Sequence, residues 1–261
     1  TDQTDRTEHF TAVLHSAKGQ KGRLTIATEA EASHYQAEFK DAAYSVAGVR
    51  KRDVRQRPAA PFTTSTMQQE AGSKLRFTAR QTMVVAQQLY EGLPVGDEGP
   101  VGLITYMRTD STQVATVAVQ EARQYIRQLF GPEYLPEKPR AYKTRSKAAQ
   151  EAHEAIRPTA LQRHPDSLKA YLTLNQLNLY TLIWRRMLAS QMADARTEAT
   201  TVDIDATSPS PVKVYLFRAT GSVMKFPGFR TLYLESRDDG DEDGNRKPLP
   251  ALIDGDPLAF L

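Results

Sequence analysis

The sequence predicts an α+β protein in which a mainly helical, winged-helix-like domain is inserted into a β-rich domain. Apolar and polar residues alternate as in strands near both ends of the chain, whereas apolar residues recur at helical spacing in the middle. The chain has 261 residues, of which 40% are hydrophobic and 25% are charged, which is typical of a globular protein. We therefore expect a β-rich domain formed by residues 1–60 and 196–261, and a helical domain over residues 61–195.

The first β-rich segment contains strand-like and helix-like stretches. Residues 8–27 predict short strands around a turn, and Glu29 to Phe39 is rich in good helix formers. A further strand, which continues into a basic stretch, is indicated by Tyr44, Val46 and Val49. Pro58 and Pro61 predict a stiff connector, because proline fixes φ and restrains the preceding residue. We interpret this connector as the domain boundary.

Two helices are expected to open the helical domain. Thr66 and Thr78 are predicted N-caps, and Gly92 is predicted to end the second helix. Residues 93–102 are rich in proline and glycine, which predicts a loop or hairpin that leads into a strand containing Tyr106. Helix–turn–helix followed by strands is typical of a winged-helix arrangement, although such a fold does not by itself establish DNA binding.

Three more helices are predicted downstream, at Thr116 to Phe130, Asp166 to Leu172 and Asn175 to Gln191. Gly131 and Pro132 should end the first of them. The core residues expected in the last are Leu179, Ile183, Trp184 and Met187. Strand alternation returns from Thr197 and continues to Leu234, so the β-rich domain is completed by the end of the chain.

Tyr106 and Arg108 are the first candidate functional residues. They stand two positions apart in a predicted strand, so their side chains should point to the same face. A phenol with a pKa of about 10 is a poor nucleophile near neutral pH, and a neighbouring guanidinium favours the phenolate and binds phosphate. This pair would suit an enzyme that attacks a phosphodiester with tyrosine. By itself the pair is better explained as an ordinary half-buried strand with an exposed arginine.

Charge is unevenly distributed although the net charge is only +3. Residues 50–80 contain eight Lys or Arg and two acidic residues. A second basic cluster consists of Arg140, Lys143, Arg145 and Lys147, and acidic residues gather at residues 238–243. This segregation suggests a surface that faces phosphate, although each cluster by itself is also explained as a solvated loop.

Composition excludes several classes of protein. The chain contains no cysteine, which excludes disulfides and cysteine-based zinc sites and permits a reducing, cytoplasmic location. It has no run of about 18 apolar residues that would cross a membrane, and its polar first residues are unlike a signal peptide. Because the sequence does not begin with methionine, we expect it to be part of a longer protein.

Residues 102–111, Gly-Leu-Ile-Thr-Tyr-Met-Arg-Thr-Asp-Ser, closely resemble the active-site tyrosine segment of type IA DNA topoisomerases. Residues 61–69, 151–159 and 182–192 are similar to further signatures of that family and occur in the family's order. Met107 resembles bacterial topoisomerase I, since the topoisomerase III branch usually has proline after the tyrosine. The weaker flanks of the chain are compatible with the family's strand-rich arch.

The resemblance implies that Tyr106 is the nucleophile and Arg108 its catalytic partner. The DNA-binding residues that it implies are Asp110, Ser111, His153 and Arg157. His153 would bind phosphate as imidazolium or help move a proton. Arg157 either contacts the DNA backbone or holds its own loop, and both interpretations stay open. Asp110 and Ser111 are alternatively explained as a turn or helix cap.

The resemblance also implies a parent enzyme that cuts one DNA strand through a 5′-phosphotyrosyl link, passes a strand and religates without ATP, relaxing negative supercoils. Mg²⁺ would be bound by a toprim domain of the parent, because no Asp-x-Asp-x-Glu signature lies in this chain and we predict no metal ligand in it. The implied partners are DNA, preferably single-stranded, and the remaining parent domains. We expect a cytoplasmic, nucleoid-associated protein whose isolated fragment binds single-stranded DNA but is inactive.

Two other hypotheses compete with this one. The chain would be a non-catalytic nucleic-acid-binding module if Tyr106 stacks or packs without reacting. It would be a metal-independent, tyrosine recombinase-like enzyme if the covalent link formed at a 3′ phosphate. A zinc protease is excluded by spacing, because Arg157 stands where the second histidine of His-Glu-x-x-His is required.

Overall fold

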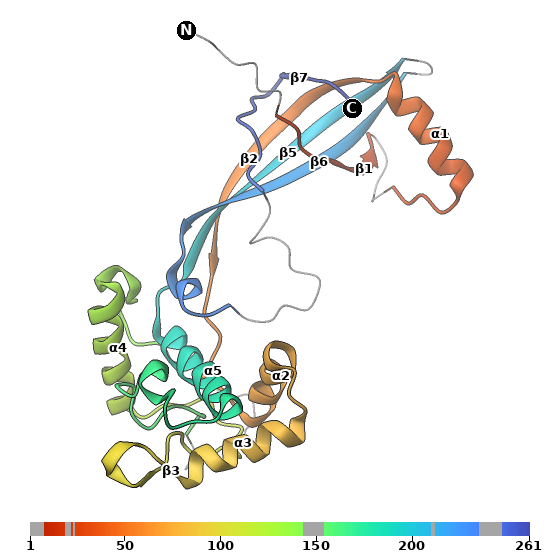
Figure 1. Ribbon diagram of the computed structural model, residues 1–261. Coiled ribbons are helices and arrows are strands. Elements are labelled where there is room, and N and C mark those ends of the chain that lie inside the picture. The colour runs from red at the N-terminus through yellow and green to blue at the C-terminus, as the bar shows by residue number, and fades with distance from the viewer. Residues whose placement is uncertain (1–7, 19–21, 23, 143–153, 210–211, 235–246) are drawn as a thin grey trace. The chain divides into compact units, whose positions relative to one another are not determined.

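The computed structural model describes residues 8–18, 22, 24–142, 154–209, 212–234 and 247–261 (Figure 1). The chain divides into two compact units. The β unit comprises Thr1–Val54, Arg196–Lys225 and Asp239–Leu261, and the helical unit comprises Arg55–Ala195 and Phe226–Asp238. The part of the chain that the structure describes contains no helix that is long and apolar enough to cross a membrane.

A five-stranded sheet forms the β unit, with strand order β1-β6-β5-β2-β7. The strands are β1 (Val13–Ala17), β2 (Ala43–Gln56), β5 (Ala195–Pro209), β6 (Val212–Phe226) and β7 (Pro257–Leu258). The pairs β1–β6 and β2–β7 are antiparallel. On β5, Val202, Ile204 and Ala206 are buried at alternate positions, because successive strand side chains point to opposite faces. Val202 and Ile204 belong to one apolar cluster of the β unit, and Ala206 belongs to a second one with Phe39 and Tyr215.

Helix α1 (Glu29–Lys40) packs on this sheet through aromatic contacts. Thr28 and Glu31 form a capping box at its start, which satisfies free N–H groups of the first turn. Phe39 meets the rings of Tyr215 and Phe217 edge-on, with centroids 5.0 and 4.9 Å away. The predicted helix at Glu29 to Phe39 is therefore confirmed.

The described part of the helical unit contains the α-helices α2 (Thr64–Leu75), α3 (Ala79–Glu91), α4 (Thr116–Phe130) and α5 (Leu174–Gln191). A short hairpin joins β3 (Leu93–Pro94) to β4 (Pro100–Val101), as predicted for this proline- and glycine-rich stretch. Short 3-10 helices lie at Gly96–Glu98, Pro132–Tyr134, Pro165–Leu168 and Gly228–Thr231. Helix α5 packs against α2, α3 and α4. Its predicted core residues Leu179, Ile183, Trp184 and Met187 are all buried.

Several local predictions need correction. Helix α2 is capped by Thr63, not Thr66; Thr66 instead occupies the third position, where its hydroxyl accepts a hydrogen bond from the Thr63 N–H at 2.9 Å. The helix predicted at Asp166 to Leu172 is reduced to the 3-10 turn at Pro165–Leu168. Leu234, predicted in a strand, follows a 3-10 turn and is exposed. The α+β class is confirmed, while the winged-helix arrangement stays a prediction.

Candidate functional site

The segment that carries Tyr106 is held in place by backbone hydrogen bonds. Leu103 N–H donates to the carbonyl of Leu89 at 2.7 Å, and Thr105 N–H donates to the carbonyl of Arg157 at 2.9 Å. Thr159 N–H returns a bond to the carbonyl of Leu103 at 3.0 Å. The segment is thus fixed on one side to the end of α3 and on the other to residues 154–159.

Thr64, at the start of α2, holds the same segment from a third direction. Its N–H donates to the carbonyl of Thr109 at 2.9 Å. Its hydroxyl donates to the carbonyl of Met107 at 2.7 Å and accepts from the N–H of Thr109 at 2.9 Å. Because Ile156 N–H also donates to the carbonyl of Phe62, three of the four signature segments named from the sequence meet here, namely 61–69, 102–111 and the described part of 151–159.

Tyr106 and Arg108 are both exposed, whereas Met107 and Thr109 between and after them are buried. The alternation predicted for this pair is present, but the predicted strand is wrong: only Ile104 forms an isolated bridge, to Pro158. The segment is held by hydrogen bonds to Thr64 and to Arg157, and it does not form a continuous β-strand pairing. The tyrosine ring is 40% exposed, so it is accessible to a large substrate.

Asp110 and Ser111 complete the segment. Asp110 is exposed, while Ser111 is buried. The Ser111 hydroxyl accepts a hydrogen bond from Gln113 N–H at 3.1 Å, and its own N–H donates to the Thr109 hydroxyl at 3.0 Å. This is the turn that the sequence analysis offered as the alternative. DNA binding by either residue stays a prediction.

Arg157 is engaged within its own loop. Its Nε and Nη2 atoms lie 2.9 and 2.7 Å from one Glu154 carboxylate oxygen, and its Nη1 donates to the carbonyl of Pro158 at 2.9 Å. The other Glu154 oxygen accepts from the N–H of Ala115 at 2.7 Å. This geometry agrees with the interpretation that Arg157 holds its loop, and contact with DNA stays a prediction. His153 lies outside the described residues.

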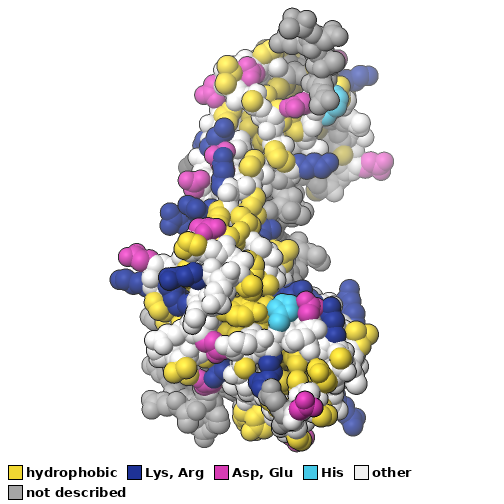
Figure 2. All heavy atoms as spheres, turned by 60° about the vertical axis from the view of Figure 1, so that its left-hand side comes forward, with side chains coloured by type: hydrophobic (Ala, Val, Ile, Leu, Met, Phe, Trp, Pro, Cys, Tyr) yellow, Lys and Arg dark blue, Asp and Glu magenta, His cyan; other side chains and the backbone are white. Residues whose placement is uncertain are grey.

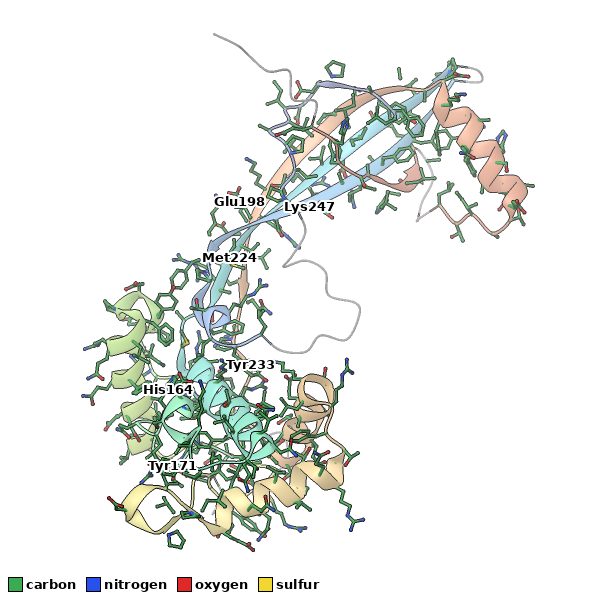
Figure 3. The ribbon with its side chains drawn as sticks, viewed as in Figure 1. His164, Tyr171, Glu198, Met224, Tyr233 and Lys247 are labelled. Atoms are coloured by element: carbon green, nitrogen blue, oxygen red, sulfur yellow. The ribbon has the colours of Figure 1, made fainter. Side chains whose placement is uncertain are left out.

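A polar cluster that joins α2 to Tyr233 was not anticipated from the sequence. The Tyr233 hydroxyl donates to Glu70 at 2.8 Å, and the Lys74 ammonium lies 3.1 Å from Glu70 and 3.8 Å from the centre of the Tyr233 ring. Tyr233 is labelled in Figure 3. Burial, and next the hydrogen bond and charge of Glu70, raise the pKa of Tyr233, although the Arg186 guanidinium opposes them. The neutral phenol therefore remains a donor and ties residues 226–234 to α2. Glu70 and Tyr233 lie far apart in the sequence, so no local pattern predicts their contact.

Tyr142 and Arg140 hold the two chain segments that lead into and out of the helical unit. The Tyr142 hydroxyl lies 3.1 Å from the carbonyl of Pro58 and 2.8 Å from that of Ser190. Burial raises the pKa of Tyr142 to about 12. Arg140 pairs with Asp194 at 2.5 Å, so this member of the second basic cluster has a structural partner. The other three members and the acidic run at 238–243 lie outside the described residues.

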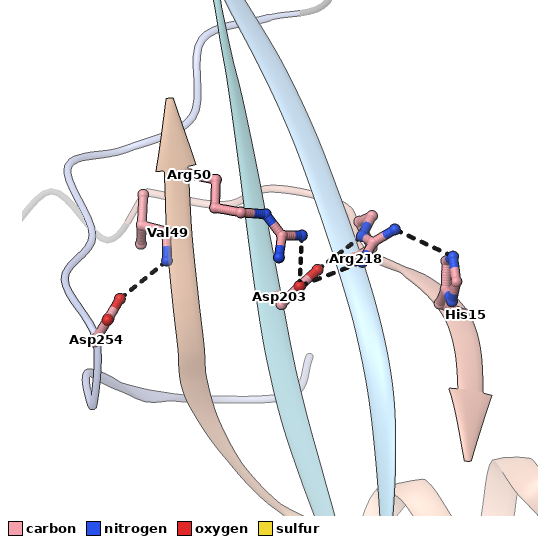
Figure 4. Close-up of polar contacts among 6 residues, drawn as sticks. All are labelled: His15, Val49, Arg50, Asp203, Arg218 and Asp254. Atoms are coloured by element: carbon pink, nitrogen blue, oxygen red, sulfur yellow. Dashed lines mark hydrogen bonds and ion pairs between the residues drawn. The ribbon is translucent and has the colours of Figure 1, made fainter. Parts of the chain in front are cut away.

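Arg50, a member of the basic cluster at residues 50–80, also has an acidic partner. Arg50 and Arg218 both bind Asp203, each at 2.7 Å, and Arg218 contacts His15 at 3.2 Å (Figure 4). Burial would raise the pKa of Asp203, but hydrogen bonds and charge from the two arginines outweigh it and lower the pKa. Lys and Arg side chains lie on both units and are interspersed with acidic ones (Figure 2). The described basic residues thus form no uniform phosphate-facing patch in that view.

Metal ligands do not cluster within the described part of the chain. No group of three or more His, Asp or Glu side chains there is arranged to hold a metal ion. No Mg²⁺ site is therefore assigned to the described residues.

The mixed fold and the three joined signature segments define the class of protein. A sequence profile of the DNA topoisomerase family matches residues 3–260, and the chain belongs to the type IA branch of that family. Its structure is similar to that of full-length topoisomerase I from Thermotoga maritima, with a TM-score of 0.72 and 33% sequence identity. The match covers 94% of this chain and 37% of the Thermotoga chain, so the present chain spans little more than a third of that relative.

Proposed function

We propose that this chain is the part of a type IA topoisomerase that carries out strand cleavage, with Tyr106 as the nucleophile. The supporting observation is the exposed phenol on a segment anchored by Thr64, Leu89 and Arg157. In this proposal the helical unit corresponds to the tyrosine domain of the family, and the β unit corresponds to its supporting arch. An enzyme that accelerates a reaction by positioning its reactants must hold the nucleophile on a rigid segment.

The proposed reaction exchanges one phosphodiester for another. The Tyr106 oxygen forms a bond to phosphorus while the bond from phosphorus to the 3′ oxygen breaks, leaving a 5′-phosphotyrosyl link. The phenol loses its proton and the departing 3′ oxygen gains one, so the number of phosphoester bonds is unchanged and the step can reverse. Arg108, which is also exposed, would stabilise charge on the non-bridging oxygens.

The other predicted residues have supporting roles in this proposal. His153 would bind the phosphate or transfer a proton, and Asp110 and Ser111 would shape the turn beside the DNA. Arg157 would act mainly by holding the loop that accepts the Thr105 hydrogen bond. Mg²⁺ would be held by acidic residues of a toprim domain outside this chain.

The parent protein would pass a second strand through the break and religate it, which relaxes negative supercoils without ATP. The chain alone would bind single-stranded DNA weakly and cleave little, because it carries only part of the reactive centre. Its partners would be single-stranded DNA and the remaining domains of the parent.

The test uses a single-stranded oligonucleotide labelled at either end. The chain is incubated with Mg²⁺ or EDTA, with and without the remaining parent region, and Tyr106→Phe is the matched control. We expect a 5′-linked adduct only when the parent region and Mg²⁺ are both present, and none from the variant. A 3′-linked adduct that survives EDTA would instead favour a recombinase-like enzyme. DNA binding without any adduct would favour the non-catalytic module.

A further inference from the structure

Tyr90 lies beside the proposed nucleophile. It is near the end of α3, and its ring centre is 5.4 Å from that of Tyr106 at an interplanar angle of 65°. Both side chains are 40% exposed. An aromatic pair at this distance and angle has the favourable edge-to-face arrangement.

The backbone fixes this pair closely. Leu103 N–H donates to the carbonyl of Leu89 at 2.7 Å, which joins the residue before Tyr90 to the Tyr106 segment. Gly102 approaches so near that a β-carbon there would lie 2.8 Å from the carbonyl oxygen of Tyr90. The end of α3 and residues 102–106 are therefore in direct contact, and no side chain fits between them.

Backbone anchors fix the Cα of Tyr106, whereas the torsion angles of its side chain depend on the groups that contact the ring. An exposed aromatic side chain can occupy more than one staggered rotamer. A neighbouring ring that contacts it favours one of these rotamers. Attack on phosphorus requires the phenol oxygen in line with the departing oxygen, and small displacements slow such reactions strongly.

We propose that Tyr90 is a positioning residue that holds the Tyr106 ring in the orientation for attack on the phosphodiester. This inference rests on the proposed function of Tyr106. The contact is made by the ring, so the hydroxyl of Tyr90 is not needed. The same ring orientation serves cleavage and its reversal, because the phosphotyrosyl link must be attacked along the same line. Loss of the contact therefore slows both directions and leaves their ratio nearly unchanged.

The experiment measures single-turnover cleavage and religation by the full-length protein on a labelled single-stranded oligonucleotide. The variants are Tyr90→Leu, which removes the ring, and Tyr90→Phe, which keeps it. Tyr171→Leu is the matched control, since Tyr171 is a similarly exposed tyrosine of the same unit. For Tyr90→Leu we expect both rate constants to fall about two- to tenfold, the fold-change that corresponds to the energy of such a ring pair. Tyr90→Phe and the control should retain the parent rates.

Three outcomes would overturn the proposal. One is an unchanged cleavage rate in Tyr90→Leu with weaker DNA binding, which would make Tyr90 a binding residue. Another is a lower adduct yield at unchanged rate, which indicates loss of folded protein. The third is a Tyr90→Phe variant as slow as Tyr90→Leu, which would assign the effect to the hydroxyl. Failure of the proposed function would give a different result: the Tyr106→Phe variant would still form an adduct with DNA.

Discussion

Thr64 gives the most informative perturbation of the candidate site. Thr64→Val keeps the shape of the side chain but removes the hydroxyl that bonds to the carbonyl of Met107 and to the N–H of Thr109. Each hydrogen bond contributes about 1 kcal/mol to stability, and a buried N–H left without a partner costs about 1–3 kcal/mol. Thr109 is 7% exposed, so part of that cost applies. We expect a loss of about 2–3 kcal/mol.

Two measurements follow from this estimate. The free energy of unfolding, measured with urea, should fall by about 2–3 kcal/mol. If the segment instead opens locally, amide exchange at Thr109 should accelerate by about 30-fold or more, since every 1.4 kcal/mol is tenfold. Cleavage by the full-length protein should slow as well, because the anchor of Tyr106 is loosened. Thr116→Val is the control, as Thr116 is exposed at the start of α4.

The reasoning would be refuted by Thr64→Val with unchanged unfolding energy and unchanged exchange at Thr109. If Thr64→Val and Thr116→Val lost the same unfolding free energy, the reasoning would also be refuted, because the loss would then be a general effect of replacing threonine by valine. Reduced stability with a parent-like cleavage rate would show that Thr64 supports the fold without positioning the tyrosine.

Three more predictions concern neighbouring residues. Gly102→Ala should destabilise the chain by about 1–3 kcal/mol, measured by urea unfolding, because its β-carbon would lie 2.8 Å from the carbonyl of Tyr90; an unchanged midpoint would contradict this. Glu154→Gln should free the Arg157 guanidinium and lower the unfolding free energy by about 1–3 kcal/mol, whereas a neutral result would show that the pair contributes little. Tyr142, with its pKa raised to about 12, favours folding below pH about 10 and loses that contribution as pH rises to about 12; Tyr142→Phe should lack this component of the alkaline decline.

The elements that the sequence predicted best are those with a local physical cause. The spacing of apolar residues predicts α4 at Thr116–Phe130, and the structure has the same bounds. Thr78 and Gly92 delimit α3 because a hydroxyl caps the first turn and glycine tolerates the positive φ of 115° at its end. Such signals need only neighbouring residues, so they can be recognised without the fold.

The errors arise where tertiary contacts override local pattern. Residues 102–111 alternate in polarity like a strand, but their hydrogen bonds go to the Thr64 hydroxyl and to loop carbonyls. The helix predicted at Asp166 to Leu172 is only a short 3-10 turn at Pro165–Leu168, which begins with Pro165.

The candidate site was predicted in part. The resemblance selected the segments around Tyr106, Thr64 and Arg157, and the structure joins them by hydrogen bonds. The ion pair of Arg157 with Glu154 was left open from sequence because either a loop contact or a DNA contact suits an arginine. Tyr90 was missed because its ring contacts Tyr106 only in the folded chain, and no local pattern predicts that contact.

The most direct test of the central claim is to identify the residue that becomes attached to DNA. The full-length protein is trapped on a single-stranded oligonucleotide, digested with protease and nuclease, and analysed by mass spectrometry. We predict a nucleotide linked through a 5′ phosphate to the peptide that contains Tyr106, and no adduct from Tyr106→Phe. A nucleotide found on any other residue, or adduct formation by the variant, would contradict the account.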